Sequence, residues 1–152
     1  PSQNRGHFGL YDKVFRVYGA FGVGKSAKFV GYWKKPAEVL AGEGVYVSCY
    51  AKDGKVLAVV SHLGREHLDQ DVEIAFDPKK LGLEGRLTKA VDLMTAPDPA
   101  YSDLFEMRKD RGVDPSRVSL ELGNFGTRIL GFEGMRVRLH LPHHTFALVE
   151  VE

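Results

Sequence analysis

Two strand-like runs flank an Asp-Gly pair in the first half of the chain. Residues 45–51 (V-Y-V-S-C-Y-A) and residues 56–61 (V-L-A-V-V-S) are rich in β-branched and aromatic side chains. Asp53 and Gly54 lie between them, and this pair favours a type I′ turn, in which both central residues have positive φ. The sequence therefore predicts an antiparallel β-hairpin. Because the second run is apolar on both faces, we expect it in mid-sheet with a packed layer on each side.

The rest of the chain repeats short strands and turns. Residues 71–76 and 135–141 alternate apolar with polar side chains, which is the pattern of a strand with one face in the core. Closely spaced strands of this kind predict an all-β fold, an antiparallel β-sandwich. Further strands are expected at residues 14–18, 28–32, 87–94, 118–122, 127–132 and 146–151, with a turn at residues 79–85.

Residues 98–112 depart from the strand pattern. An Asp-Pro pair begins this stretch, Gly112 ends it, and apolar side chains recur between them at helical spacing. We therefore predict one short helix, residues 99–111, inserted between two strands. A chain of 152 residues has the length of a single domain, so residues 1–152 are interpreted as one β-sandwich domain.

Composition argues against two classes of partner. The chain carries 21 Lys and Arg against 20 Asp and Glu, a net charge of +1, which is not the basic footprint of a nucleic-acid-binding protein. No apolar run reaches the roughly 18 residues that a membrane span needs. We expect neither nucleic acid nor membrane as a partner. The chain begins at Pro1, with no Met and no signal-peptide pattern, as expected of a module cut from a longer protein.

A phosphate-binding motif appears near the N-terminus. The segment from Gly19 to Ser26 (G-A-F-G-V-G-K-S) matches G-x-x-x-x-G-K-S/T, in which Lys25 would neutralise phosphates and Ser26 would reach Mg²⁺. Such a loop must open onto a helix. The residues that follow, 27–36, contain Gly and Pro and few strong helix formers. A glycine-rich turn between strands is therefore favoured over nucleotide binding.

Other groups of reactive residues give no active site. His140, His143 and His144 cluster around Pro142 at a strand end, and no carboxylate or Cys stands beside them in sequence to complete a metal site. The acidic residues lie mostly at alternating strand positions or in turns. Cys49 fits a small buried hydrophobic residue better than a reactive thiolate. We predict no catalytic residue, no metal ligand and no cofactor.

The N-terminal segment, residues 1–40, is strongly aromatic. Tyr32 and Trp33, beside two lysines, are candidates for contact with a carbohydrate or with another domain, because aromatic rings offer apolar faces with a polar edge. Tyr101 is a third candidate. The alternative is that Trp33 lies in the core or seals the edge of the sandwich.

Several segments together resemble a known family. They are residues 29–33 (F-V-G-Y-W), the hairpin, residues 71–78 (D-V-E-I-A-F-D-P) with L-G-L at 81–83, and the closing strands with Pro142 between them. In this order they resemble the C-terminal β-sandwich domain of bacterial glycoside-hydrolase-like proteins, of the family 123 type or the amylase type. The resemblance covers residues 21–151. His62 stands where such domains often have Asn, and the insertion at residues 98–112 is longer than usual.

The resemblance implies a function. Such domains follow a catalytic (β/α)-barrel, which holds the acid and the nucleophile, and their parent proteins are secreted or periplasmic bacterial glycoside hydrolases. The chain is therefore expected to be a non-catalytic accessory domain that packs against the barrel through residues 1–40. The alternatives are a carbohydrate-binding module that uses Tyr32, Trp33 or Tyr101, and nucleotide binding through residues 19–26.

Overall fold

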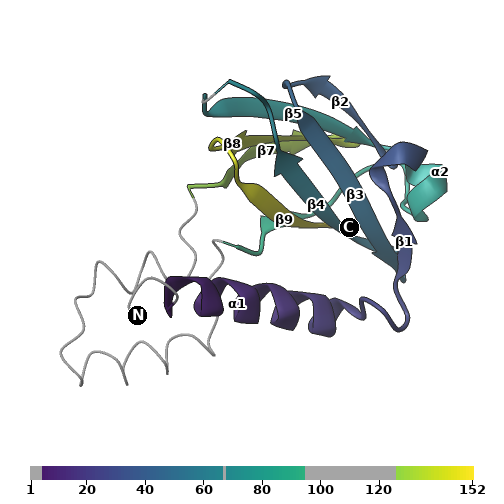
Figure 1. Ribbon diagram of the computed structural model, residues 1–152. Helices are drawn as coiled ribbons and strands as arrows, with labels where there is room; N and C mark the ends of the chain where they lie inside the picture. The colour runs from purple at the N-terminus through teal and green to yellow at the C-terminus, as the bar shows by residue number, and fades with distance from the viewer. Residues whose placement is uncertain (1–4, 67, 95–125) are drawn as a thin grey trace.

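Two antiparallel sheets face each other in the computed structural model of the chain, which describes residues 5–66, 68–94 and 126–152, with side chains from Lys13 onward (Figure 1). The first sheet has the strand order β1-β3-β4-β9-β6. Its strands are β1 (Lys28–Val30), β3 (Val45–Lys52), β4 (Lys55–His62), β9 (Phe146–Val151) and β6 (Ala90–Asp92). The second sheet has the order β2-β5-β8-β7. Its strands are β2 (Ala37–Ala41), β5 (Gln70–Phe76), β8 (Arg136–Leu141) and β7 (Arg128–Glu133). The predicted all-β antiparallel sandwich is confirmed.

The hairpin that the sequence predicts joins β3 to β4. Asp53 and Gly54 have φ angles of 51° and 76°, and Lys52 pairs with Lys55 across a two-residue turn, as the type I′ turn requires. Strand β4 lies between β3 and β9. Its buried Val60 packs in the core between the sheets, while its buried Leu57 belongs to a second cluster on the outer face. The expectation of packed layers on both sides of this strand is therefore confirmed.

The main core lies between the two sheets. It is built from the alternate residues that each strand turns inward, and most of its side chains are fully buried. Its largest fully buried members are Ile74, Leu139, Leu141, Val56, Val60, Val72, Val137 and Val149.

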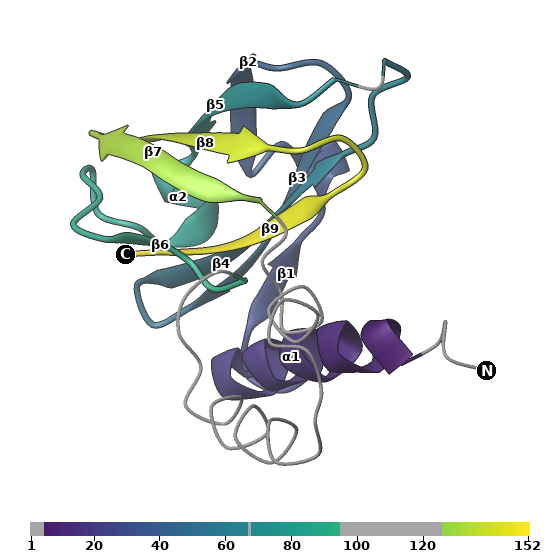
Figure 2. The same ribbon diagram turned by 90° about the vertical axis from the view of Figure 1, so that its left-hand side faces the viewer.

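A helix covers the outer face of the five-stranded sheet, and the prediction of a strand at residues 14–18 is wrong. Helix α1 (Arg5–Phe21) runs along that face (Figures 1 and 2). The buried Phe21 at its end packs with Leu57 and Leu148 of the sheet. The apolar residues of α1 that join this cluster recur at spacings of three and four, and burial of that helical side outweighs the β propensity of single residues. They are Val14, Val17, Tyr18 and Phe21.

Four smaller differences separate prediction and structure. The strand expected at residues 28–32 ends early, because the 3-10 turn η1 (Tyr32–Lys34) follows β1. The turn at residues 79–85 contains a one-turn helix, α2 (Pro78–Leu81), capped by the carboxylate of Asp77. Strand β6 is shorter than the predicted 87–94, and β2 has no counterpart in the sequence predictions.

The helix predicted at residues 99–111 and the strand at 118–122 lie outside the described residues, as does Tyr101. Within the described part of the chain, no helix is long and apolar enough to cross a membrane.

Candidate functional site

Six aromatic rings form a continuous row on the outer side of the five-stranded sheet. The row runs from Tyr18 at the end of α1 to Tyr46 near the start of β3, and each ring lies against the next. The distances between ring centroids are 5.7 Å for Tyr18–Tyr50, 5.0 Å for Tyr50–Phe29, 5.9 Å for Phe29–Trp33, 5.4 Å for Trp33–Tyr32 and 5.2 Å for Tyr32–Tyr46. The structure thus brings together Tyr32 and Trp33, the two predicted contact residues that it describes.

Strand pairing and one hydrogen bond position these rings. Phe29 of β1 lies opposite Tyr50 of β3. Residues 46, 48 and 50 share the outer face of β3, because side chains alternate along a strand. The backbone N–H of Tyr32 donates a hydrogen bond to Ser48 Oγ over 3.0 Å, which fastens η1 to the sheet. Gly31 lies against the Trp33 indole, and an added Cβ would clash with the ring and push it aside, so glycine at this position lets the indole lie close to the backbone.

Helix α1 covers one end of the row and leaves the other end exposed. Burial, and to a smaller extent the neighbouring Tyr50, raise the pKa of Tyr18 above its ordinary value. The four rings of the row beyond Tyr18 and Tyr50 are exposed, and we call these four residues the aromatic face. Their exposed fractions are 47% for Phe29, 50% for Tyr32, 63% for Trp33 and 45% for Tyr46. These rings form one contiguous apolar surface, which in a folded protein usually marks a binding site or an interface.

An open hollow of about 360 Å³ adjoins the aromatic face. Its lining has two tyrosines, two serines and two aliphatic residues, and no charged residue. The lining residues are Tyr32, Tyr46, Ser48, Val59, Ser61 and Leu63. Tyr46 lies directly opposite Ser61 in the β3–β4 register, so the hollow rests on two adjacent strands.

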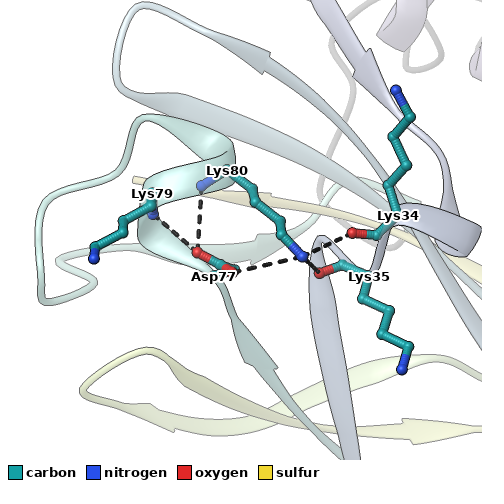
Figure 3. A network of polar contacts seen from close by, with 5 residues as sticks. All are labelled: Lys34, Lys35, Asp77, Lys79 and Lys80. Carbon is teal, nitrogen blue, oxygen red and sulfur yellow. Dashed lines mark hydrogen bonds and ion pairs between the residues drawn. The ribbon is translucent and has the colours of Figure 1, made fainter.

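A polar network anchors the far side of η1 (Figure 3). The Lys80 ammonium donates to the carbonyl oxygens of Lys34 at 2.9 Å and Lys35 at 3.3 Å, and lies 3.8 Å from the Asp77 carboxylate. Asp77 also accepts from the backbone N–H groups of Lys79 and Lys80. These contacts tie the turn that carries Trp33 to α2, which limits the freedom of the aromatic face.

The phosphate-binding motif has the wrong surroundings for its proposed chemistry. Residues 19–21 are the last residues of α1, and residues 22–26 lead from it towards strand β1, whereas a phosphate-binding loop follows a strand and opens a helix. The prediction of a turn between two strands is therefore wrong, because the segment joins a helix to a strand. The C-terminal end of a helix is the negative end of its dipole, which disfavours an anion. The carbonyl of Gly22 already accepts the backbone N–H groups of Lys25, Ser26 and Ala27. This arrangement argues against nucleotide binding at the segment.

The histidines near Pro142 join two loops. The backbone N–H of His143 donates to the Asp69 carboxylate over 3.1 Å, and Nε2 of the buried His62 forms a hydrogen bond of 2.9 Å with the carbonyl oxygen of Leu68. His140 pairs with Asp71 across the two strands β8 and β5 at 2.7 Å. Among the described residues, no three His, Cys, Asp or Glu side chains converge in a way that could hold a metal ion.

The sequence predictions missed Tyr46, Ser48 and Ser61 as parts of the site. The pattern of residues 45–51 predicts a strand and gives no signal of a binding site. Alternation alone places Tyr46 and Ser48 on the face opposite the buried Val47 and Cys49. The contact with η1, however, depends on the turn after β1, which the sequence pattern did not predict.

Comparison with protein families identifies a matching family model. A family model described as glycoside hydrolase 123, C-terminal domain, matches residues 11–100, which is more than half of the chain. The matched range contains every residue of the aromatic face and of the hollow. Comparisons with curated proteins and with solved structures found no match.

Proposed function

Because the chain belongs to the family of glycoside hydrolase 123 C-terminal domains, we propose that it is a non-catalytic accessory domain that packs against the catalytic domain of its enzyme. The family match favours the family 123 type over the amylase type among the resemblances in the sequence. The partner implied by that resemblance is a (β/α)-barrel, which the sandwich stabilises or whose cleft it borders. The barrel holds the catalytic acid and nucleophile.

One observation carries this proposal: helix α1 has apolar side chains on two sides. Val17 and Phe21 pack on the five-stranded sheet, and Phe15 of the same helix is 69% exposed. A helix that merely covers a sheet is expected to have a polar outer side. Phe15, Phe29 and Trp33 all belong to residues 1–40, the segment that the sequence assigned to the interface. A partner that covers this side of the molecule would remove these side chains from water.

The lining of the hollow supports a non-catalytic role. Glycoside hydrolysis ordinarily uses a pair of carboxyl groups that flank the scissile bond. The hollow beside the aromatic face contains hydroxyls and rings, and no Asp or Glu. This hollow therefore lacks the carboxyl pair that hydrolysis uses, and in the proposed role the hydrolytic step belongs to the catalytic domain.

Photo-crosslinking in the complete enzyme tests the proposed interface. Phe15→p-benzoylphenylalanine is expected to form a crosslink with a peptide of the catalytic domain, identified by mass spectrometry. The matched control is Phe132→p-benzoylphenylalanine, because Phe132 is 43% exposed on β7 in the other sheet. Equal crosslinking from both positions, or none from position 15, would overturn the proposal that α1 faces the catalytic domain.

A further inference from the structure

We propose that the hollow lined by Tyr32, Tyr46, Ser48 and Ser61 binds one pyranose ring of an uncharged carbohydrate. This site lies apart from the exposed side of α1 but adjoins Trp33, which the proposed interface includes, so it is tested on the chain without the catalytic domain. It lies where the Tyr32 and Tyr46 rings of the aromatic face meet the hydroxyl groups of Ser48 and Ser61.

The two tyrosine rings form a corner. Their centroids lie 5.2 Å apart and their planes meet at 73°, so one ring can lie flat under a ligand while the other stands beside it. The face of an aromatic ring is electron-rich, and the C–H groups on one side of a pyranose are weakly positive. A sugar stacked on one tyrosine would therefore be flanked by the second, and its hydroxyls would point to the rim.

The serine hydroxyls supply the polar contacts. Ser48 Oγ accepts the Tyr32 N–H over 3.0 Å, which leaves its own proton to donate to a ligand oxygen. The Ser61 hydroxyl has no hydrogen-bond partner among the described residues, and can both donate and accept. Ser48 and Ser61 lie on adjacent strands, and Ser61 is directly opposite Tyr46. A few polar groups in a pocket lined otherwise by aromatic and aliphatic side chains are typical of small-molecule recognition.

Charge and size select the ligand class. The lining holds no Lys, Arg, Asp or Glu, so nothing in it compensates the desolvation of a phosphate or a carboxylate. A volume of about 360 Å³ lies at the lower end of the range for ligand sites, which suits one sugar ring. The sheet and the tethered turn hold the rings in place before binding, which lowers the entropic cost of association.

Titration with neutral sugars tests the site directly. The 152-residue chain is titrated with lactose, cellotetraose and N,N′-diacetylchitobiose at millimolar concentrations, and binding is followed by fluorescence and by amide NMR shifts. Trp33 is the only tryptophan and its ring lies 5.4 Å from that of Tyr32, so it reports on the hollow. At least one sugar is expected to give a saturable change, with shifted amides confined to Tyr32, Ser48, Ser61 and their neighbours.

Variants make the result specific. Tyr46→Ala is expected to abolish binding, and Ser61→Ala to weaken it about tenfold, the value of one hydrogen bond. Ser61→Ala removes a single hydroxyl group on the outer face of the sheet and is expected to keep the fold. It therefore remains informative if Tyr46→Ala is unstable. Phe132→Ala, on the other sheet, is expected to bind as the wild type does.

The site is refuted if none of the three sugars gives a saturable change, or if Tyr46→Ala and Ser61→Ala both bind like the wild type. Because these titrations use the chain by itself, they succeed or fail independently of the crosslinking test in the complete enzyme.

Discussion

The backbone N–H of Tyr32 donates a hydrogen bond to Ser48 Oγ over 3.0 Å, and this bond joins the turn that carries Trp33 to strand β3. We expect Ser48→Ala to lower the free energy of unfolding by about 1 kcal/mol. Because the turn is then held less firmly, the fluorescence anisotropy of Trp33 should fall. Ser61→Ala is the control, since the Ser61 hydroxyl bonds no described residue. Identical anisotropy in the two variants would show that Ser48 does not hold the turn.

A buried hydrogen bond links strand β6 to the residue before β7. Thr127 Oγ1 donates to one oxygen of the buried Asp92 carboxylate over 2.6 Å, and the Met94 N–H donates to the other over 2.9 Å. Thr127→Val keeps the shape of the side chain but removes a hydrogen-bond donor from a buried carboxylate. We expect it to lower the free energy of unfolding by about 1–3 kcal/mol. Chemical denaturation measures it.

The control for this bond is Thr88→Val. Thr88 Oγ1 donates to the Glu152 carbonyl over 3.2 Å at an exposed site, where water can replace the lost donor. Thr88→Val should therefore lower the free energy of unfolding by well under half of the amount expected for Thr127→Val. Equal losses in the two variants would contradict the importance of burial at Asp92.

The two sides of the five-stranded sheet are expected to respond differently to cavities. Leu57 and Leu139 are both fully buried, Leu57 beneath α1 and Leu139 between the sheets. Either Leu→Ala change should lower the free energy of unfolding by about 2–5 kcal/mol. Leu57→Ala should in addition speed hydrogen exchange in α1 relative to the strands, whereas Leu139→Ala should leave that ratio unchanged. An unchanged ratio in both variants would mean that α1 does not depend on this contact.

Local chemistry explains which elements the sequence could predict. The Asp53-Gly54 turn and the alternation of β8 are set by backbone preference and by a single buried face, so both were found. Helix α1 was missed because its burial depends on the outer face of β4, which lies far along the chain. The fully apolar pattern of β4 did predict that some layer covers it, but not which segment supplies that layer.

The site was predictable only in part for the same reason. Tyr32 and Trp33 are adjacent aromatic residues in the sequence, so they can be predicted as contact residues without knowledge of the fold. Tyr46 and Ser61 join them through strand register and through the turn after β1, which place distant residues side by side. Lys80, which braces that turn from α2, gave no signal in the sequence because an exposed lysine usually has no specific role.

The Cys49 thiol is fully buried, and burial raises its pKa to about 12. The thiolate is the reactive form of cysteine. We therefore expect no reaction of the folded chain with a thiol reagent such as dithionitrobenzoate at neutral pH, and one equivalent of reaction after denaturation. Rapid labelling of the folded chain would show that the core around β3 opens readily.

The same shift makes stability depend on alkaline pH. In the unfolded chain the thiol ionises near its ordinary pKa of 9.0, whereas in the folded chain it stays protonated up to about pH 12. Between these values the folded state holds one more proton, so each unit of rising pH lowers the free energy of unfolding by about 1.4 kcal/mol through this group. Cys49→Ala should lose this component, and its stability should fall less steeply than that of the wild type above pH 9 while the two curves stay parallel at pH 7–8. Other groups titrate in the same range, but they contribute equally to both proteins and cancel in the difference. Parallel curves throughout would mean that Cys49 ionises equally in the two states.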